Sequence, residues 1–110
     1  MKRTFKEFPA FSRLVQDGEI SDAQVARVQA DIMSGGGRTM AGTGGVKKIR
    51  CEARTKGKSG GWRVFFADYG DQEVTFLIWA FPKSRQAALS ATQRKAIRSL
   101  KQELDAEMGV

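Results

Sequence analysis

Three segments rich in β-forming residues follow one another closely in the second half of this 110-residue chain. They span Val46–Arg54, Trp62–Tyr69 and Glu73–Phe81, and only short links separate them. The links "TKGKSGG" and "YGDQ" are typical of tight connections between antiparallel strands. A connection this short cannot cross a sheet to a parallel neighbour. The segments therefore predict an antiparallel sheet, whose last strand ends at Pro82 because proline cannot donate to a strand ladder.

The remaining elements are predicted from capping signals and apolar spacing. They are a strand over Thr4–Phe8 and helices over Pro9–Gln16, Ser21–Ser34 and Ser90–Glu107. The two longer helices begin with the capping boxes "SDAQ" and "SATQ", followed by apolar residues at helical spacing. The glycine-rich stretch Ser34–Gly45 is interpreted as a flexible connection. This order predicts one α+β domain over residues 1–110, with an antiparallel sheet and the helices on one of its faces.

Composition narrows the function classes. The formal net charge is +7, which favours an anionic partner, and nucleic acid before an acidic protein or a membrane surface. The chain has no histidine and one cysteine, so it lacks the usual ligand set of a zinc site and cannot form an intramolecular disulfide. We therefore expect no metal and a reducing, cytoplasmic location, without a signal peptide or a membrane-spanning segment.

Basic residues are concentrated between Lys47 and Arg63, where Glu52 is the only acid. The alternation of a strand puts Ile49, Cys51 and Ala53 on one face, and Lys48, Arg50, Glu52 and Arg54 on the other. Arginine binds phosphate in a bidentate manner, and lysine adds a mobile point charge. The sequence therefore predicts an apolar core face and a cationic groove for phosphate groups.

Simpler explanations remain beside this one. An alternating charged strand is often only a solvated face, and this explanation suits any one of these cations taken singly. The set as a whole favours phosphate binding, because compensating acids are missing. Both tryptophans are expected in the core rather than stacked on bases, whereas Phe81 suits either place. We expect Glu52 to pair with Arg50 or Arg54; the sharper hypothesis makes it a general base.

Two blocks, "GTGGVKKIR" (Gly42–Arg50) and "GKSGGWRVFF" (Gly57–Phe66), resemble the RelE/HigB family of toxins from bacterial toxin–antitoxin modules. The second block is similar to the pattern of the HigB-like branch, in which paired glycines precede an arginine and then aromatic residues. "SATQRKAI" resembles the start of the family's late helix, and the resemblance spans about Phe5 to Leu104. It implies the RelE-like fold, in which two N-terminal helices pack on a twisted antiparallel sheet and a further helix ends the chain.

The resemblance also implies an activity, the ribosome-dependent cleavage of mRNA without a cofactor. A ribose 2′-OH would attack its own 3′-phosphate, leaving a 2′,3′-cyclic phosphate and a 5′-OH. The residues implied to be catalytic are Lys48, Arg50, Arg63, Lys83 and Arg85. Those implied to bind RNA are Lys47, Arg54, Lys56, Lys58 and Phe81.

Within this set, Arg63 matches the family's central arginine and is expected, with Arg50, to stabilise charge on the phosphoryl oxygens. Lys48 or Lys56 is the candidate base, and Lys83 or Arg85, after the last strand, would protonate or stabilise the leaving oxygen. Phe81 stands where many relatives carry tyrosine, so it can stack on a base but cannot transfer a proton. Pro82 replaces the family's usual glycine.

The implied partners are the ribosome, mRNA and a HigA-like helix-turn-helix antitoxin, and no membrane. Two other functions are compatible with the same residues. In one, the chain is a non-catalytic basic module that binds RNA or DNA, and its cations only neutralise phosphates. In the other, the basic face serves only to dock an acidic protein.

Overall fold

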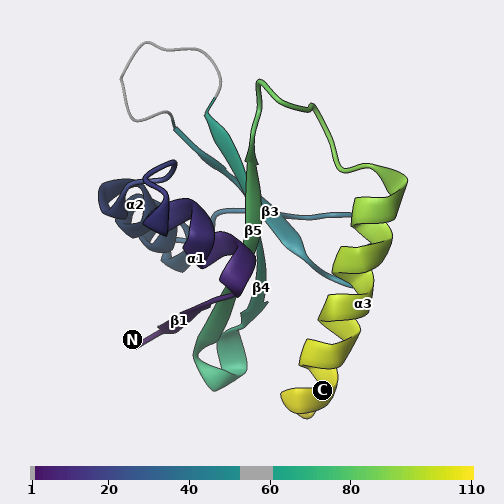
Figure 1. Ribbon diagram of the computed structural model, residues 1–110. Helices are drawn as coiled ribbons and strands as arrows, with labels where there is room; N and C mark the ends of the chain where they lie inside the picture. Colours follow the sequence, from purple (N-terminus) through teal and green to yellow (C-terminus); the bar gives the residue numbers. More distant parts are fainter. Residues whose placement is uncertain (1, 53–60) are drawn as a thin grey trace.

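The computed structural model describes residues 2–52 and 61–110. Its elements follow one another along the chain in the order β1 (Thr4–Glu7), α1 (Pro9–Gln16), α2 (Asp22–Met33), β2 (Arg38–Thr39), β3 (Lys47–Cys51), β4 (Trp62–Tyr69), a 3-10 turn (Gly70–Gln72), β5 (Val74–Pro82) and α3 (Ala91–Glu107). The strands form one sheet in the order β1-β5-β4-β3-β2. The predicted α+β class is confirmed, and the architecture agrees with the RelE-like fold (Figure 1).

The sheet is mixed, whereas the sequence predicted an antiparallel one. Pairing is antiparallel from β2 through β5, but β1 runs parallel to β5, with Thr4 opposite Val74. Short links constrain only the strands that they join, and β1 is separated from β5 by most of the chain. The strand β2 was not predicted, because it is two residues long and lies inside the glycine-rich stretch interpreted as a connection.

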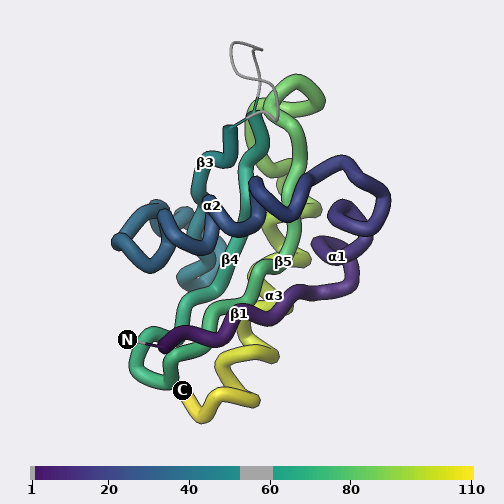
Figure 2. Tube along the Cα trace, turned by 90° about the vertical axis from the view of Figure 1, so that its left-hand side faces the viewer, coloured from purple at the N-terminus to yellow at the C-terminus, as the bar shows by residue number. Residues whose placement is uncertain are grey.

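The helices cover both faces of the sheet, and the prediction that they share one face is wrong. Figure 1 shows α1 and α2 on one side of the sheet and α3 on the other, and in Figure 2 α2 crosses in front of the strands. The reason lies in the middle of β4, Val64 to Ala67, where the side chains are apolar on both faces of the sheet. Val64 and Phe66 pack with α1 and α2, whereas Phe65 and Ala67 pack with α3.

The capping boxes of α2 and α3 are confirmed. The hydroxyls of Ser21 and Ser90 accept the N–H groups of Gln24 and Gln93, whose side chains accept the serine N–H groups in return. Each reciprocal pair satisfies two backbone donors that a helix start leaves without partners. Helical spacing then directs apolar side chains into the core, as predicted, among them Val25, Val28 and Ile32 of α2 and Ile97 and Leu104 of α3. In the part of the chain that the structure describes, no helix is long and apolar enough to cross a membrane.

A polar contact fixes the C-terminal half of α3 to the sheet. The Tyr69 hydroxyl donates to Asp105 Oδ1 at 2.7 Å, and Lys101 Nζ donates to the same oxygen at 2.6 Å. The Lys101 ammonium also lies 5.1 Å from the centre of the Tyr69 ring. Burial, followed by the hydrogen bond to Asp105, raises the pKa of Tyr69. The bonds from Lys101 and Tyr69 lower the pKa of Asp105.

We predict that Asp105→Asn destabilises the protein at neutral pH and flattens its acid unfolding. A lowered folded-state pKa means that the Asp105 carboxylate adds stability above its ordinary pKa of 3.8, and that this stability is lost as the pH falls through the lowered value. Losing the charge-assisted bonds should cost about 1–3 kcal/mol of unfolding free energy at pH 7. Denaturant titrations at several pH values measure this, with Glu103→Gln on the exposed side of α3 as control. An unchanged acid limb in Asp105→Asn would contradict the prediction.

Candidate functional site

The strand register brings four cations together on one face of the sheet. Arg38 of β2 lies opposite Lys48 of β3, and Arg50 of β3 lies opposite Arg63 of β4. Residues opposite one another on neighbouring strands share a face, so the two pairs form adjacent rows. Each row ends in aromatic residues. Beyond Lys48 come Phe65 and Trp79, and beyond Arg63 comes Phe81.

This cationic face is the α3 side of the sheet. Val46, which precedes β3, is fully buried in the α3 core. The even positions that follow, Lys48 and Arg50, lie on the same face. On the other face, Ile49 and Cys51 pack against the α1 and α2 core, which confirms the division predicted from alternation for these two residues. Ala53, also expected there, lies outside the described residues.

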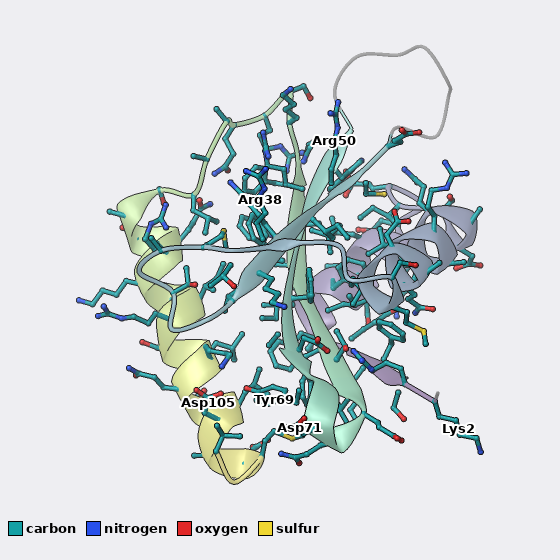
Figure 3. The ribbon with its side chains drawn as sticks, turned by 180° about the vertical axis from the view of Figure 1, so that it is seen from behind. Lys2, Arg38, Arg50, Tyr69, Asp71 and Asp105 are labelled. Atoms are coloured by element: carbon teal, nitrogen blue, oxygen red, sulfur yellow. The ribbon has the colours of Figure 1, made fainter. Side chains whose placement is uncertain are left out.

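Two adjoining hollows cover the four cations. The first, of about 360 Å³, lies between β2, the sheet and the β5–α3 connection, and it includes Arg38, Lys48, Arg63 and Arg94. The second, of about 460 Å³, shares Arg38, Lys48 and Arg63 and extends to Arg50. Among the described residues that line the two hollows, every charged side chain is an arginine or a lysine. Figure 3 shows Arg38 and Arg50 in the upper half of the sheet, far from the contact between Tyr69 and Asp105.

Aromatic rings from β4 and β5 form part of the wall of the first hollow. Phe65 and Phe81 line it, and their ring centres are 5.3 Å apart. Trp79 is partly buried, and the centre of its ring lies 5.5 Å from the centre of the Phe81 ring. Phe81 is only 1% exposed, so its ring is mainly a support for the hollow in this structure. Its predicted stacking on a base stays a prediction.

Arg63 occupies the centre of the site. It belongs to β4, between β3 and β5, and it lines both hollows. Its Nε atom is buried and has no hydrogen-bond partner among the described residues. A buried donor without a partner is unfavourable, and like charges opposite one another on a sheet are also destabilising. An anion bound between Arg50 and Arg63 would relieve both costs.

Among the described residues Glu52 pairs with Arg27 of α2 rather than with Arg50, which corrects one part of the expectation, and its pairing with Arg54 stays a prediction. Its Oε2 lies 3.6 Å from Nη1 of Arg27 on α2, and both side chains are largely exposed. The strand β3 ends at Cys51, so Glu52 no longer follows the alternation. In addition, Gln24 Nε2 donates to the Glu52 carbonyl at 2.8 Å, which joins this residue to α2. Arg54 lies outside the described residues.

Comparison with protein families agrees with this geometry. Residues 2–108 match the family described as the RelE toxin of the RelE / RelB toxin-antitoxin system. The chain belongs to the RelE toxin family. It is therefore a toxin of a toxin–antitoxin module and pairs with an antitoxin, and toxins of this family are generally endoribonucleases that act on mRNA.

Lys47, Lys83 and Arg85 of this RelE toxin, which were also predicted as site residues, do not line the two hollows. Lys47 is half-buried and alternates to the face opposite Lys48, while its strand partner across β2 is Thr39. Lys83 and Arg85 are exposed in the connection after β5 and do not line either hollow. Lys56 and Lys58 lie outside the described residues. The structure thus brings Lys48, Arg50 and Arg63 together, with Phe81 beside them in the first hollow. The remaining predicted residues lie outside the two hollows or outside the described residues.

Two cations of this site were not predicted from the sequence. Arg38 lies in the glycine-rich stretch, and a strand of two residues is too short for its alternation to be recognised. Arg94 is one of several basic residues of α3, and it lines the first hollow. The only sequence signal for Arg38 is its place between Gly37 and the apolar Met40, which is consistent with a short edge strand.

The same stretch contains a structural turn rather than a plain connection. Thr43 is fully buried, and its hydroxyl donates to the Met40 carbonyl at 2.8 Å and accepts the Val46 N–H at 3.1 Å. Gly42 and Gly44, on either side of it, have positive φ angles of 74° and 75°, which favour glycine. This turn fixes how β2 returns to β3, and it therefore sets where Arg38 meets Lys48.

In the described parts of the chain, no group of three or more histidine, cysteine or acidic residues could hold a metal ion. The single cysteine, Cys51, is buried under α2, and burial raises the pKa of its thiol, followed by the effect of Asp31. A thiol of this kind is a poor nucleophile. Among the described residues that line the hollows, arginine and lysine are the charged side chains available for chemistry.

We predict that Thr43→Val lowers the free energy of unfolding by about 1–3 kcal/mol, because it leaves the Met40 carbonyl and the Val46 N–H without their buried partner. Thr43→Ser keeps the hydroxyl and should lose less. Urea unfolding of the two variants measures the difference. A Thr43→Val variant as stable as the wild type, with the loss confined to Thr43→Ser, would mean that the Thr43 methyl group rather than its hydroxyl stabilises the turn.

Proposed function

We propose that this toxin is a ribosome-dependent mRNA endoribonuclease of the HigB-like kind, which inhibits translation in the cytoplasm. The observation that carries the proposal is the placement of like charges opposite one another, Arg38 with Lys48 and Arg50 with Arg63, around one groove. Such pairs destabilise a sheet in the absence of a counterion. A phosphate backbone supplies the missing charge, and RNA is the phosphate polymer on which this family acts.

The proposed reaction is attack by a ribose 2′-OH on its own 3′-phosphate. The 2′ oxygen forms a bond to phosphorus, the bond to the 5′ oxygen of the next nucleotide breaks, and the products are a 2′,3′-cyclic phosphate and a 5′-OH. The proton leaves the 2′-OH, and the departing 5′ oxygen takes one up. Because atoms and charge balance within the RNA and two proton transfers, neither a metal nor a covalent enzyme intermediate is required.

Arg50 and Arg63, which line the second hollow together, are proposed to bind the phosphoryl oxygens, whose negative charge increases in the transition state. Lys48 lies in the next row, within the same hollow, where it can take part in the proton transfer from the 2′-OH. We assign Lys83 and Arg85 to the departing oxygen, since they follow β5 at the edge of the site. A ribosome that holds the mRNA in line would supply the orientation that these residues do not.

Binding along the RNA would involve a wider set of groups. Lys47, Arg54, Lys56 and Lys58 are proposed to contact mRNA or ribosomal RNA on either side of the reacting phosphate. Phe81, with Phe65 and Trp79 around it, is proposed to support a base next to the cations. The antitoxin is proposed to be a HigA-like helix-turn-helix protein.

A second function, binding without cleavage, is favoured by one observation. All charged side chains that line the hollows in the described chain are cations, and neither a carboxylate nor a histidine is among them. A site of this composition binds phosphate well even where proton transfer fails. The chain would then occupy RNA or DNA with a steep dependence on salt and leave it intact.

Mapping mRNA ends on translating ribosomes separates the two functions. Purified toxin should create discrete new 5′ ends that require the ribosome and end in 5′-OH. Intact mRNA, together with binding that weakens steeply as salt increases, would instead support the non-catalytic module. Cleavage of naked RNA at the same rate would contradict the dependence on the ribosome.

We predict that Arg63→Ala folds but no longer inhibits growth when its expression is induced. Loss of one preorganised donor to the phosphoryl oxygens should reduce cleavage about 10²–10³-fold, or roughly 3–4 kcal/mol. Arg13→Ala removes the same charge from an exposed position on α1, on the opposite face of the sheet, and should remain toxic. A soluble, folded Arg63→Ala protein with full toxicity would refute the site.

A further inference from the structure

The helix α3 contacts the segment that carries Arg38. Arg94, in the first turn of α3, donates from Nη1 to the Ala41 carbonyl at 2.6 Å. A Cβ atom placed on Gly42 would lie 3.3 Å from Arg94 Cδ, so the arginine side chain runs closely along this backbone. The contact joins residues 53 positions apart, and Ala41 lies two residues after Thr39, the last residue of β2.

The position of β2 depends on such outside contacts. It is an edge strand of two residues that pairs only with β3, and both Arg38 and Thr39 are exposed. A strand this short makes few ladder hydrogen bonds, so local opening costs little free energy. Beyond it, the Met40 N–H donates to the Val46 carbonyl at 2.9 Å. The bond from Arg94 to Ala41 is the next constraint along the chain.

We propose that Arg94 is a positioning residue, which holds β2 through the Ala41 carbonyl and so directs Arg38 toward the phosphate bound by Lys48 and Arg63. This inference rests on the proposed function. Arg94 is half-buried and lines the same hollow as these three cations. One of its five N–H donors is used on the backbone, and this use fixes the guanidinium relative to β2.

The competing explanation is that Arg94 binds the RNA phosphate itself. The two explanations differ in what happens when Arg38 is absent. A positioning residue that acts through Arg38 loses its effect once Arg38 is gone. A direct ligand keeps its effect, because its own contact with phosphate does not depend on Arg38.

The experiment is a double-mutant cycle with Arg38→Met, Arg94→Met and the double variant, assayed by single-turnover cleavage of mRNA on translating ribosomes. Misplacement of a catalytic group by about 1 Å can cost up to roughly a hundredfold in rate, so we expect Arg94→Met to be about tenfold to a hundredfold slower. The double variant should be no slower than Arg38→Met alone. Multiplied effects in the double variant would overturn the proposal in favour of direct contact.

Lys95→Met is the matched control. It removes the same charge from the neighbouring residue of α3, which is exposed and does not line either hollow. General weakening of the attraction to RNA should therefore appear equally in both single variants. Equal losses in Lys95→Met and Arg94→Met would overturn the proposal.

A second measurement needs no activity. The Met40 N–H is hydrogen-bonded to the Val46 carbonyl, and its exchange with solvent should become faster in Arg94→Met. Exchange of the β4 amides in Arg94→Met, and of the Met40 amide in Lys95→Met, should remain as in the wild type. Unchanged exchange at Met40 would refute the positioning role. If the wild-type toxin does not cleave mRNA, the proposed function fails, and exchange at Met40 still decides whether Arg94 holds β2.

Discussion

The register between β3 and β4 is the constraint on which the rest of this structure depends. It sets Ile49 opposite Val64 under the N-terminal helices and Arg50 opposite Arg63 on the other face. A shift by one residue would turn every side chain of β3 to the opposite face. Apolar Ile49 and Cys51 would then lose their packing, and charged side chains would be forced under α2. The burial of the core face therefore holds the cations in place, although the cations repel one another.

The two faces of the sheet have different tasks. The face under α1 and α2 is apolar along β4, where Val64 and Phe66 are almost fully buried. The other face is divided along its length. One end is covered by α3 and locked through Tyr69 and Asp105, while the other end is left open and holds the cations. The helix that completes the core thus also forms one wall of the site, through Arg94.

The charges of Arg50 and Arg63 repel one another across the two strands, and an anionic substrate would relieve this repulsion. In the part of the chain that the structure describes, Nε of Arg63 is buried without a hydrogen-bond partner, and two pairs of like charges lie opposite one another. Each of these features disfavours the folded chain when no ligand is bound. An anion whose charge increases during reaction stabilises the same groups most in the transition state. In this proposal the sheet holds the cations close together at a cost in stability, and binding of the anionic substrate offsets their repulsion.

The amino-acid sequence by itself determined the features that depend on near neighbours. Capping boxes, apolar spacing in α2 and α3, and the alternation of β3 act over two to four residues, and each was predictable. Tertiary structure alone decided the parallel pairing of β1, the opposite placement of α3, the pairing of Glu52 with Arg27 and the entry of Arg38 and Arg94 into the site. These features depend on which distant surfaces become buried together. Alternation could show that Lys48 and Arg50 share a face, but only the packing of α3 determined that this face would be half core and half groove.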